Sequence, residues 1–144
     1  MAQMDDDAVK APARGVFRIM LSGIFIVAGL NHLLGTEKVA GRLENAPMGH
    51  LATALADPTT LVLLAGVALL VGGLALLVGL YTRLAAVGLI ALIIPITLTV
   101  QTGGLETLGP LFKNIGLAGG LIYFATHGAD VWSLDAHTFF RRKH

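Results

Sequence analysis

Four long runs of apolar residues dominate the pattern along this chain, and short polar segments separate them. They cover about residues 15–34, 59–80, 84–100 and 111–127. The second run holds 22 residues without a charge, and a helix of that length would measure roughly 33 Å, enough to cross the hydrocarbon core of a bilayer. The pattern therefore predicts an all-α integral membrane protein, a four-helix bundle within residues 14–136.

Small residues form a stripe on the second predicted helix. Their spacing alternates between three and four residues, which places them on one face: Ala65, Ala68, Gly72, Ala75 and Gly79. The fourth predicted helix carries a second pair, Gly116 and Gly120. Since small residues let helix backbones approach closely in lipid, we expect these positions to be helix-packing surfaces.

The segments between the apolar runs indicate how the helices are connected. Residues 81–83 form a link so short that the second and third helices must be antiparallel. Residues 35–58 have mixed polarity, and the spacing of their apolar residues predicts one or two short amphipathic helices at the membrane surface. Residues 1–13 are polar and small, which predicts a disordered tail, and residues 137–144 form a basic tail.

Composition supports lipid as the solvent of this chain. Of its 144 residues, 55% are hydrophobic and 13% are charged, with a mean hydropathy of +0.77; soluble domains carry about 25% charged residues. The net charge of +1 gives no electrostatic basis for binding nucleic acid. The absence of cysteine excludes disulfides and cysteine-ligated metal or iron–sulfur sites, and no repeated ligand spacing predicts a metal.

The basic residues are unevenly divided between the two ends of the predicted bundle. One end holds seven of them, Lys10, Arg14, Arg18, Arg83, Arg141, Arg142 and Lys143, and the other holds three, Lys38, Arg42 and Lys113. Cytoplasmic ends of membrane helices are enriched in lysine and arginine. We therefore expect the N and C termini to be cytoplasmic and residues 35–58 to face outward.

Several short motifs follow one another in an order that resembles the DoxX family of small membrane proteins. They are Arg18 with Ala28-Gly29-Leu30, Gly72-Gly73-Leu74 with Gly79-Leu80, Thr82-Arg83-Leu84-Ala85-Ala86, Lys113-Asn114 with Gly119-Gly120, and Gly128 with Ser133-Leu134-Asp135. Asp130 stands where that family commonly has glycine. The resemblance extends over residues 14–136.

The resemblance implies a multi-pass protein of the inner (plasma) membrane of a bacterium or archaeon. Some members of the family are subunits of a thiosulfate:quinone oxidoreductase or are linked to terminal quinol oxidases, and many have no known activity. It therefore implies a subunit or accessory of a quinone-linked respiratory or redox complex, with quinone as a non-covalent cofactor. Whether the chain takes part in an oxidoreductase reaction stays open at this point.

Polar residues at the outer ends of two predicted helices form a candidate pocket: Asn31, His32, Lys113 and Asn114. Histidine titrates near neutral pH and can transfer a proton during quinol oxidation, and lysine can donate to a quinone oxygen. The structural alternatives are a histidine bonded to a backbone carbonyl, and a lysine that reaches to the membrane surface or pairs with Glu106 or Asp57.

Arg18 lies one turn inside the first predicted helix, where a charge requires a partner. We expect it to pair with Asp130 or Asp135 in the segment after the fourth helix. The alternative partner is a lipid phosphate.

Two further functions stay open beside the redox role. The chain could be a non-catalytic subunit that packs against other membrane proteins or a second copy of itself, or it could bind a small lipophilic molecule near the expected kink at Pro95.

Overall fold

The described residues of the chain form six helices. The computed structural model describes residues 2–101, 103–129 and 131–136, with side chains from residue 10 onward. Within these residues the structure is all-α and contains no strand. The helices are α1 (Ala2–Leu34), α2 (Thr36–Glu44), α3 (Gly49–Thr53), α4 (Pro58–Val78), α5 (Thr82–Val100) and α6 (Leu105–His127).

The ends of α4 follow from local sequence. The Asp57 carboxylate accepts a hydrogen bond from the Thr60 N–H at 3.2 Å, and Pro58 occupies the first turn, where no N–H partner is needed. At the other end Gly79 adopts φ +68°, a left-handed conformation that glycine tolerates without steric cost. The chain then turns at once into α5, and this α4–α5 turn marks one end of the molecule.

Three helices are long and apolar enough to cross a membrane: the Lys10–Leu34 part of α1, α4 and α5. Only 28%, 28% and 22% of their most apolar segments are buried inside the chain. Large side chains such as Met20, Leu64 and Leu84 are 64–71% exposed. Because so large an apolar surface is unfavourable in water, these helices are surrounded by lipid. The 23-residue α6 is continuous, but Lys113 and Asn114 interrupt its apolar sequence, and it is not among the three. A fourth membrane crossing and the orientation of the termini therefore stay predictions.

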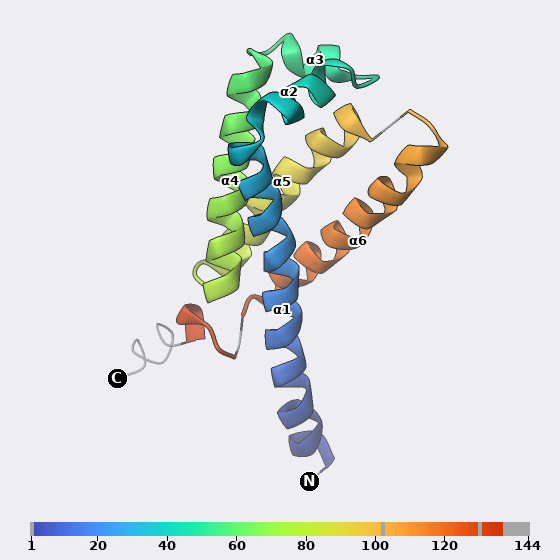
Figure 1. The fold of residues 1–144 in the computed structure, drawn as a ribbon. Helices are drawn as coiled ribbons and strands as arrows, with labels where there is room; N and C mark the ends of the chain where they lie inside the picture. The colour runs from blue at the N-terminus through green and yellow to red at the C-terminus, as the bar shows by residue number, and fades with distance from the viewer. Residues whose placement is uncertain (1, 102, 130, 137–144) are drawn as a thin grey trace.

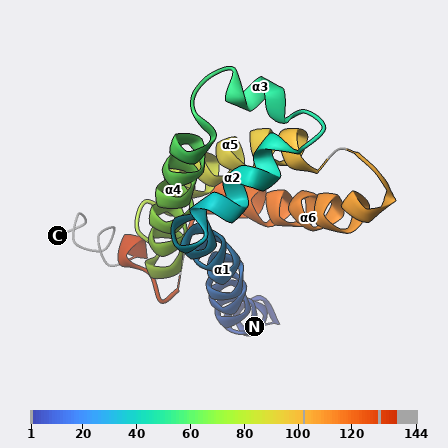
Figure 2. The same ribbon diagram turned by 45° about the horizontal axis from the view of Figure 1, so that its top comes forward.

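The helices form two packed pairs that diverge toward one end (Figure 1). α1 packs along α4, and α6 packs along α5, which also contacts α4. α1 and α6 make few contacts, among them those of Gly120 with Phe17 and Leu21 and that of the Phe17 ring with Phe124. Figure 2 shows α2 and α3 covering the end that lies opposite the α4–α5 turn. At this same end α6 points away from α1. We call these the α4–α5 turn end and the α2–α3 end.

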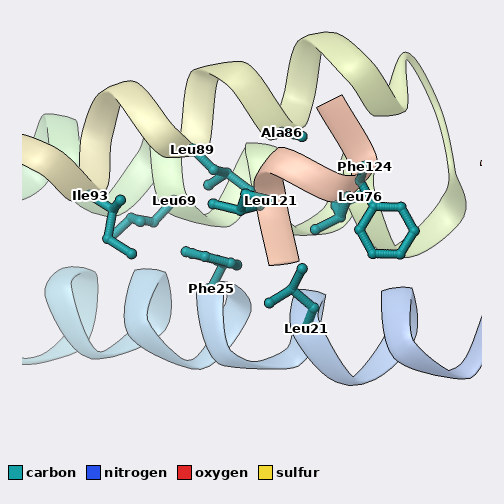
Figure 3. Packing of buried hydrophobic residues seen from close by; sticks show 9 residues of the cluster. All are labelled: Leu21, Phe25, Leu69, Leu76, Ala86, Leu89, Ile93, Leu121 and Phe124. Atoms are coloured by element: carbon teal, nitrogen blue, oxygen red, sulfur yellow. The ribbon is translucent and has the colours of Figure 1, made fainter. Parts of the chain in front are cut away.

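The core lies where the four long helices converge (Figure 3). Each of the four contributes to it, and its buried members are Leu21, Phe25, Leu69, Leu76, Ala86, Leu89, Ile93, Leu121 and Phe124. A second small cluster of Ala40, Leu43 and Val62 fixes α2 against the start of α4. This second cluster explains why residues 36–44 are helical, since their apolar face is buried there.

Glycine determines how closely α1 approaches α4. A Cβ atom added to Gly29 would lie 2.7 Å from the backbone N of Leu70, and one on Gly73 would lie 3.0 Å from the backbone N of Ile26. These contacts, together with those of Gly66 against His32, are shorter than a side chain allows without a shift of its neighbours. Gly29, Gly66 and Gly73 therefore form the seam between the two helices.

The predicted small-residue stripe lies beside this seam and has several neighbours. Gly72 packs against Leu89 of α5, and Gly79 packs against Arg18 and Ser133. Ala65 and Ala68 line a cavity at the α2–α3 end, and Ala75 is partly buried. Of the predicted pair on α6, Gly120 packs against α1, whereas Gly116 is exposed, and a Cβ added to it would have no described atom within 4 Å.

The structure differs from the expected segment boundaries at two places. Residues 2–13 continue α1 rather than forming a disordered tail. Alanine and lysine in this segment favour helix, and Pro12 does not end it. α6 begins at Leu105 instead of near residue 111 and includes Pro110. The expected basic tail, residues 137–144, lies outside the described residues.

Candidate functional site

A cavity of about 680 Å³ lies under the α2–α3 end of the molecule. α2 and α3 cover it, α1, α4 and α5 form its walls, and α6 contributes Lys113. Most of the lining is aliphatic, from residues such as Leu61, Ala65 and Leu92. The polar side chains that line it are Asn31, His32, Arg42, Thr99, Gln101 and Lys113. We call it the α2–α3 cavity.

His32 is held in a defined orientation in the last turn of α1. Its Nδ1 lies 2.8 Å from the carbonyl oxygen of Ala28. Because a carbonyl can only accept, Nδ1 carries the proton in this bond, and in a neutral imidazole Nε2 then has a free lone pair. Thr36 donates to the His32 carbonyl at 2.8 Å, and the absence of a side chain at Gly66 makes room for the His32 Cβ. His32 therefore both bonds to a backbone carbonyl and lines the cavity, so the two interpretations made from the sequence are compatible.

Lys113 and Asn114 have different environments although they are neighbours. Lys113 is exposed and lines the cavity. Asn114 is 7% exposed and donates from Nδ2 to Thr97 Oγ1 at 2.9 Å, while Thr97 donates to the Ile93 carbonyl at 2.6 Å. Asn114 thus joins α6 to α5 and is not among the residues that line the cavity, contrary to its expected place in the pocket. The bond from Asn114 to Thr97 holds this turn of α6 against α5 and so positions the neighbouring Lys113 at the cavity.

Arg42 and Gln101 are cavity residues that the sequence pattern did not predict. Arg42 extends from α2, beside the buried Leu43 that anchors this helix. The Gln101 Oε1 atom is buried, and no donor among the described residues reaches it. The signal for Arg42 is the amphipathic spacing of residues 39–43, but that spacing does not show which surface the helix covers. Gln101 carries no such signal.

Arg18 forms the centre of a second polar cluster, at the α4–α5 turn end. The side chain is 1% exposed. Nη1 donates to the carbonyls of Leu76 and Leu77, each at 2.9 Å, and Nη2 donates to those of Val131 and Trp132, at 3.3 Å and 2.6 Å. The first pair belongs to the last turn of α4, at the negative end of the helix dipole, which favours a cation; the Leu76 carbonyl also accepts the Gly79 N–H, at 3.3 Å. We call this arrangement the Arg18 latch.

Asp135 binds the turn beside the latch. Its two carboxylate oxygens accept from the N–H groups of Tyr81 and Thr82, each at 2.8 Å, and its own N–H donates to the Gly79 carbonyl at 2.9 Å. Asp135 therefore caps the start of α5 from a distant part of the chain. Arg18 and Asp135 both attach the segment after α6 to the turn, and the other expected partner, Asp130, lies outside the described residues.

Two close contacts explain why glycine is needed around the latch. A Cβ on Gly15 would lie 2.7 Å from the ring of Trp132, and a Cβ on Gly79 would overlap Arg18 and Ser133. Trp132 has a positive φ of 50°, which is uncommon for a residue with a side chain. Its carbonyl accepts the shortest of the Arg18 bonds, and this bond helps to hold that backbone conformation. The latch is a structural site that closes the fold.

The described residues contain no group of three or more histidine, aspartate or glutamate side chains that could hold a metal. His50 lies in α3 and His127 at the α4–α5 turn end, and neither lines the cavity with His32.

Long apolar helices with lipid-exposed sides define a multi-pass integral membrane protein of the all-α class. Its distinctive sites are the α2–α3 cavity and the Arg18 latch. The sequence model of the DoxX family matches residues 14–102, more than half of the chain, and the protein belongs to this family. The match includes Asn31, His32, Arg42 and Gln101 and ends before α6 and Lys113. No curated protein and no solved structure matches the chain.

Proposed function

We propose that this DoxX-family protein is a subunit or accessory of a quinone-linked redox complex and that the α2–α3 cavity binds the quinone ring. The observation that carries the proposal is that Asn31, His32 and Lys113, from distant parts of the sequence, line one cavity. Its volume of about 680 Å³ is in the usual range for small-molecule sites, which combine apolar walls with a few polar groups.

The polar groups at the cavity suit the chemistry of a quinone head group. The Lys113 ammonium and the Asn31 amide can donate to quinone oxygens. The Nε2 lone pair of His32 can accept a proton from a quinol hydroxyl, because Nδ1 is already engaged with the Ala28 carbonyl. The exposed Leu64 at the wall gives the aliphatic tail of such a molecule contact with both cavity and lipid.

The uneven distribution of basic residues supports a particular orientation. We place the α4–α5 turn end, with Arg14, Arg18 and Arg83, at the cytoplasmic side of a bacterial or archaeal plasma membrane. The cavity would then open toward the outer side.

Quinone retention by the purified protein tests the proposal. The full chain would be reconstituted in lipid nanodiscs with a short-chain ubiquinone, and bound quinone would be measured after rapid filtration. We expect His32→Leu and Lys113→Gln each to weaken binding about tenfold, since each removes one polar partner of the ring. His127→Leu is the matched control, because His127 also bonds to the carbonyl four residues before it but lies at the α4–α5 turn end. Unchanged binding in both cavity variants would refute the proposal.

A second candidate function, a non-catalytic subunit that packs against larger membrane proteins, is favoured by the outer face of α6. Gly109 and Gly116 lie seven residues apart on this helix, and neither has a described atom within 4 Å of an added Cβ. Phe112, between them, is 66% exposed. This function predicts that larger subunits co-purify after gentle extraction and are lost in a Gly116→Leu variant that still folds. A chain that is monodisperse, alone and active would contradict it.

A further inference from the structure

The charged groups at the α2–α3 end are sorted by sign around the cavity. Arg42 and Lys113 line it from two different helices, and no aspartate or glutamate is among the described lining residues. The same end of the molecule holds four carboxylates, Glu37, Glu44, Asp57 and Glu106, and none of them lines the cavity. The end as a whole is therefore not basic, but the cavity is.

The two strong cations of the cavity are not neutralised by the protein. Neither Arg42 nor Lys113 forms an ion pair with a carboxylate in the described part of the chain. Both are exposed side chains that line the cavity beside its apolar wall, so each can contact a group bound there. An anionic group bound in the cavity would supply the missing counter-charge.

Gln101 adds a requirement of a different kind. Its buried Oε1 is an acceptor without a donor among the described residues. A ligand with one ionised oxygen and one remaining hydroxyl would satisfy both conditions, because its hydroxyl donates to Gln101 while its charged oxygen faces the cations. A neutral quinone has two carbonyl oxygens and can meet neither.

We infer that the α2–α3 cavity prefers an anionic ring head group, so that it holds the deprotonated, reduced form of a quinone, or a similarly acidic ring compound, more tightly than the neutral oxidised quinone. The inference rests on the proposed function and specifies its ligand class. Arg42 and Lys113 act as charge partners of the head group, and the aliphatic walls hold the tail.

The test uses two ring compounds that differ mainly in charge. One is a hydroxynaphthoquinone with a long alkyl chain, which is ionised at neutral pH, and the other is its neutral methyl ether. Binding of each to the full chain in nanodiscs of zwitterionic lipid would be measured by isothermal titration calorimetry. We expect the anion to bind at least about tenfold more tightly than the ether, with an advantage that falls as salt concentration rises.

Variants separate the charge effect from a loss of fold. Arg42→Gln should weaken binding of the anion several-fold and leave binding of the ether within about twofold, whereas Lys113→Gln should weaken binding of both compounds, and of the anion more, because Lys113 also donates to the neutral ring. Lys38→Gln removes the same charge from α2 at a residue that does not line the cavity, and it should preserve the full preference. Unchanged ether binding shows that the Arg42→Gln and Lys38→Gln variants are folded, and the circular dichroism spectrum shows whether Lys113→Gln is.

Each outcome has a distinct meaning. Equal binding of the two ring compounds, or a preference that survives the Arg42→Gln/Lys113→Gln double variant, would overturn this inference and leave the proposed function standing. A long-chain fatty acid provides the third arm. If it binds and neither ring compound does, the quinone proposal fails while the preference for an anionic head group holds for a lipid ligand; if none of the three binds, both fail.

Discussion

Replacing Arg18 by methionine removes the Arg18 latch with little change in side-chain length. All guanidinium donors are lost, and the carbonyls of Leu76, Leu77, Val131 and Trp132 lose a shared partner. Because Arg18 is 1% exposed, water cannot readily replace it. The segment after α6 then keeps its attachment mainly through Asp135.

The expected size of the effect follows from the bond lengths. Three of the bonds are 2.9 Å or shorter, and a hydrogen bond from a charged group contributes about 1.5–3 kcal/mol. Removal of a buried cation recovers part of its desolvation cost, so the net loss is smaller than the sum of the bonds. We expect Arg18→Met to lower the free energy of unfolding by about 2–4 kcal/mol. Arg18→Lys should lose roughly half as much, since one ammonium cannot span both pairs of carbonyls.

Unfolding in mixed micelles, followed by circular dichroism as the fraction of denaturing detergent rises, measures this free energy. Hydrogen exchange of residues 131–135 should accelerate in Arg18→Met, because the segment loses its bonds to α1. Arg42→Met is the control, an exposed arginine on α2 whose loss should cost no more than about 0.5 kcal/mol. A variant at Arg18 that unfolds like the wild type, or like Arg42→Met, would refute the account of the latch.

Four other substitutions test the packing and capping described above, each in the same unfolding assay or in the quinone-binding assay. Gly73→Leu should destabilise the chain by about 1–3 kcal/mol because its Cβ would meet the backbone of Ile26, whereas Gly116→Leu should change stability by less than about 0.5 kcal/mol; equal effects would contradict the glycine seam. Asp135→Ala should cost about 1–2 kcal/mol by removing the cap of α5, and a neutral result would show that the two N–H groups find other partners. Asn114→Leu should reposition Lys113 and weaken quinone binding while Lys113 itself is unchanged, and full binding would show that the bond to Thr97 has no part in the site.

Much of the fold follows from sequence because lipid imposes a simple rule on it. Apolar runs long enough to span a bilayer must be helices, and the predicted run at residues 59–80 becomes α4 at Pro58–Val78, with an aspartate cap and a glycine end. The predicted disordered tail is wrong because it follows from polarity alone, while helix propensity continues α1 to Ala2. The predicted start of α6 is too late because Pro110 suggests a boundary that the helix accommodates.

Positions of residues along a helix are easier to predict than their neighbours in other helices. Helix direction alone predicts Asn31, His32 and Lys113 at similar depth, and they do line one cavity. Arg42 reaches it because α2 folds back over α4, and Gln101 lies there because it directly follows α5; sequence periodicity encodes neither position. Likewise the sequence predicts that the small residues around Gly72 share one face of α4. It does not predict that Gly66 and Gly73 contact α1, because that depends on the side from which α1 approaches α4.

The latch also has a consequence for the order in which the protein is assembled during synthesis. Arg18 leaves the ribosome early, and two of its four carbonyl partners, on Val131 and Trp132, follow more than a hundred residues later. Until translation reaches them, a nascent chain holds an incompletely solvated cation inside an apolar helix. A chain that ends before residue 131 would therefore lack the Val131 and Trp132 carbonyls as partners of this guanidinium, so the last segment to be synthesised completes the hydrogen bonding of one of the first helices.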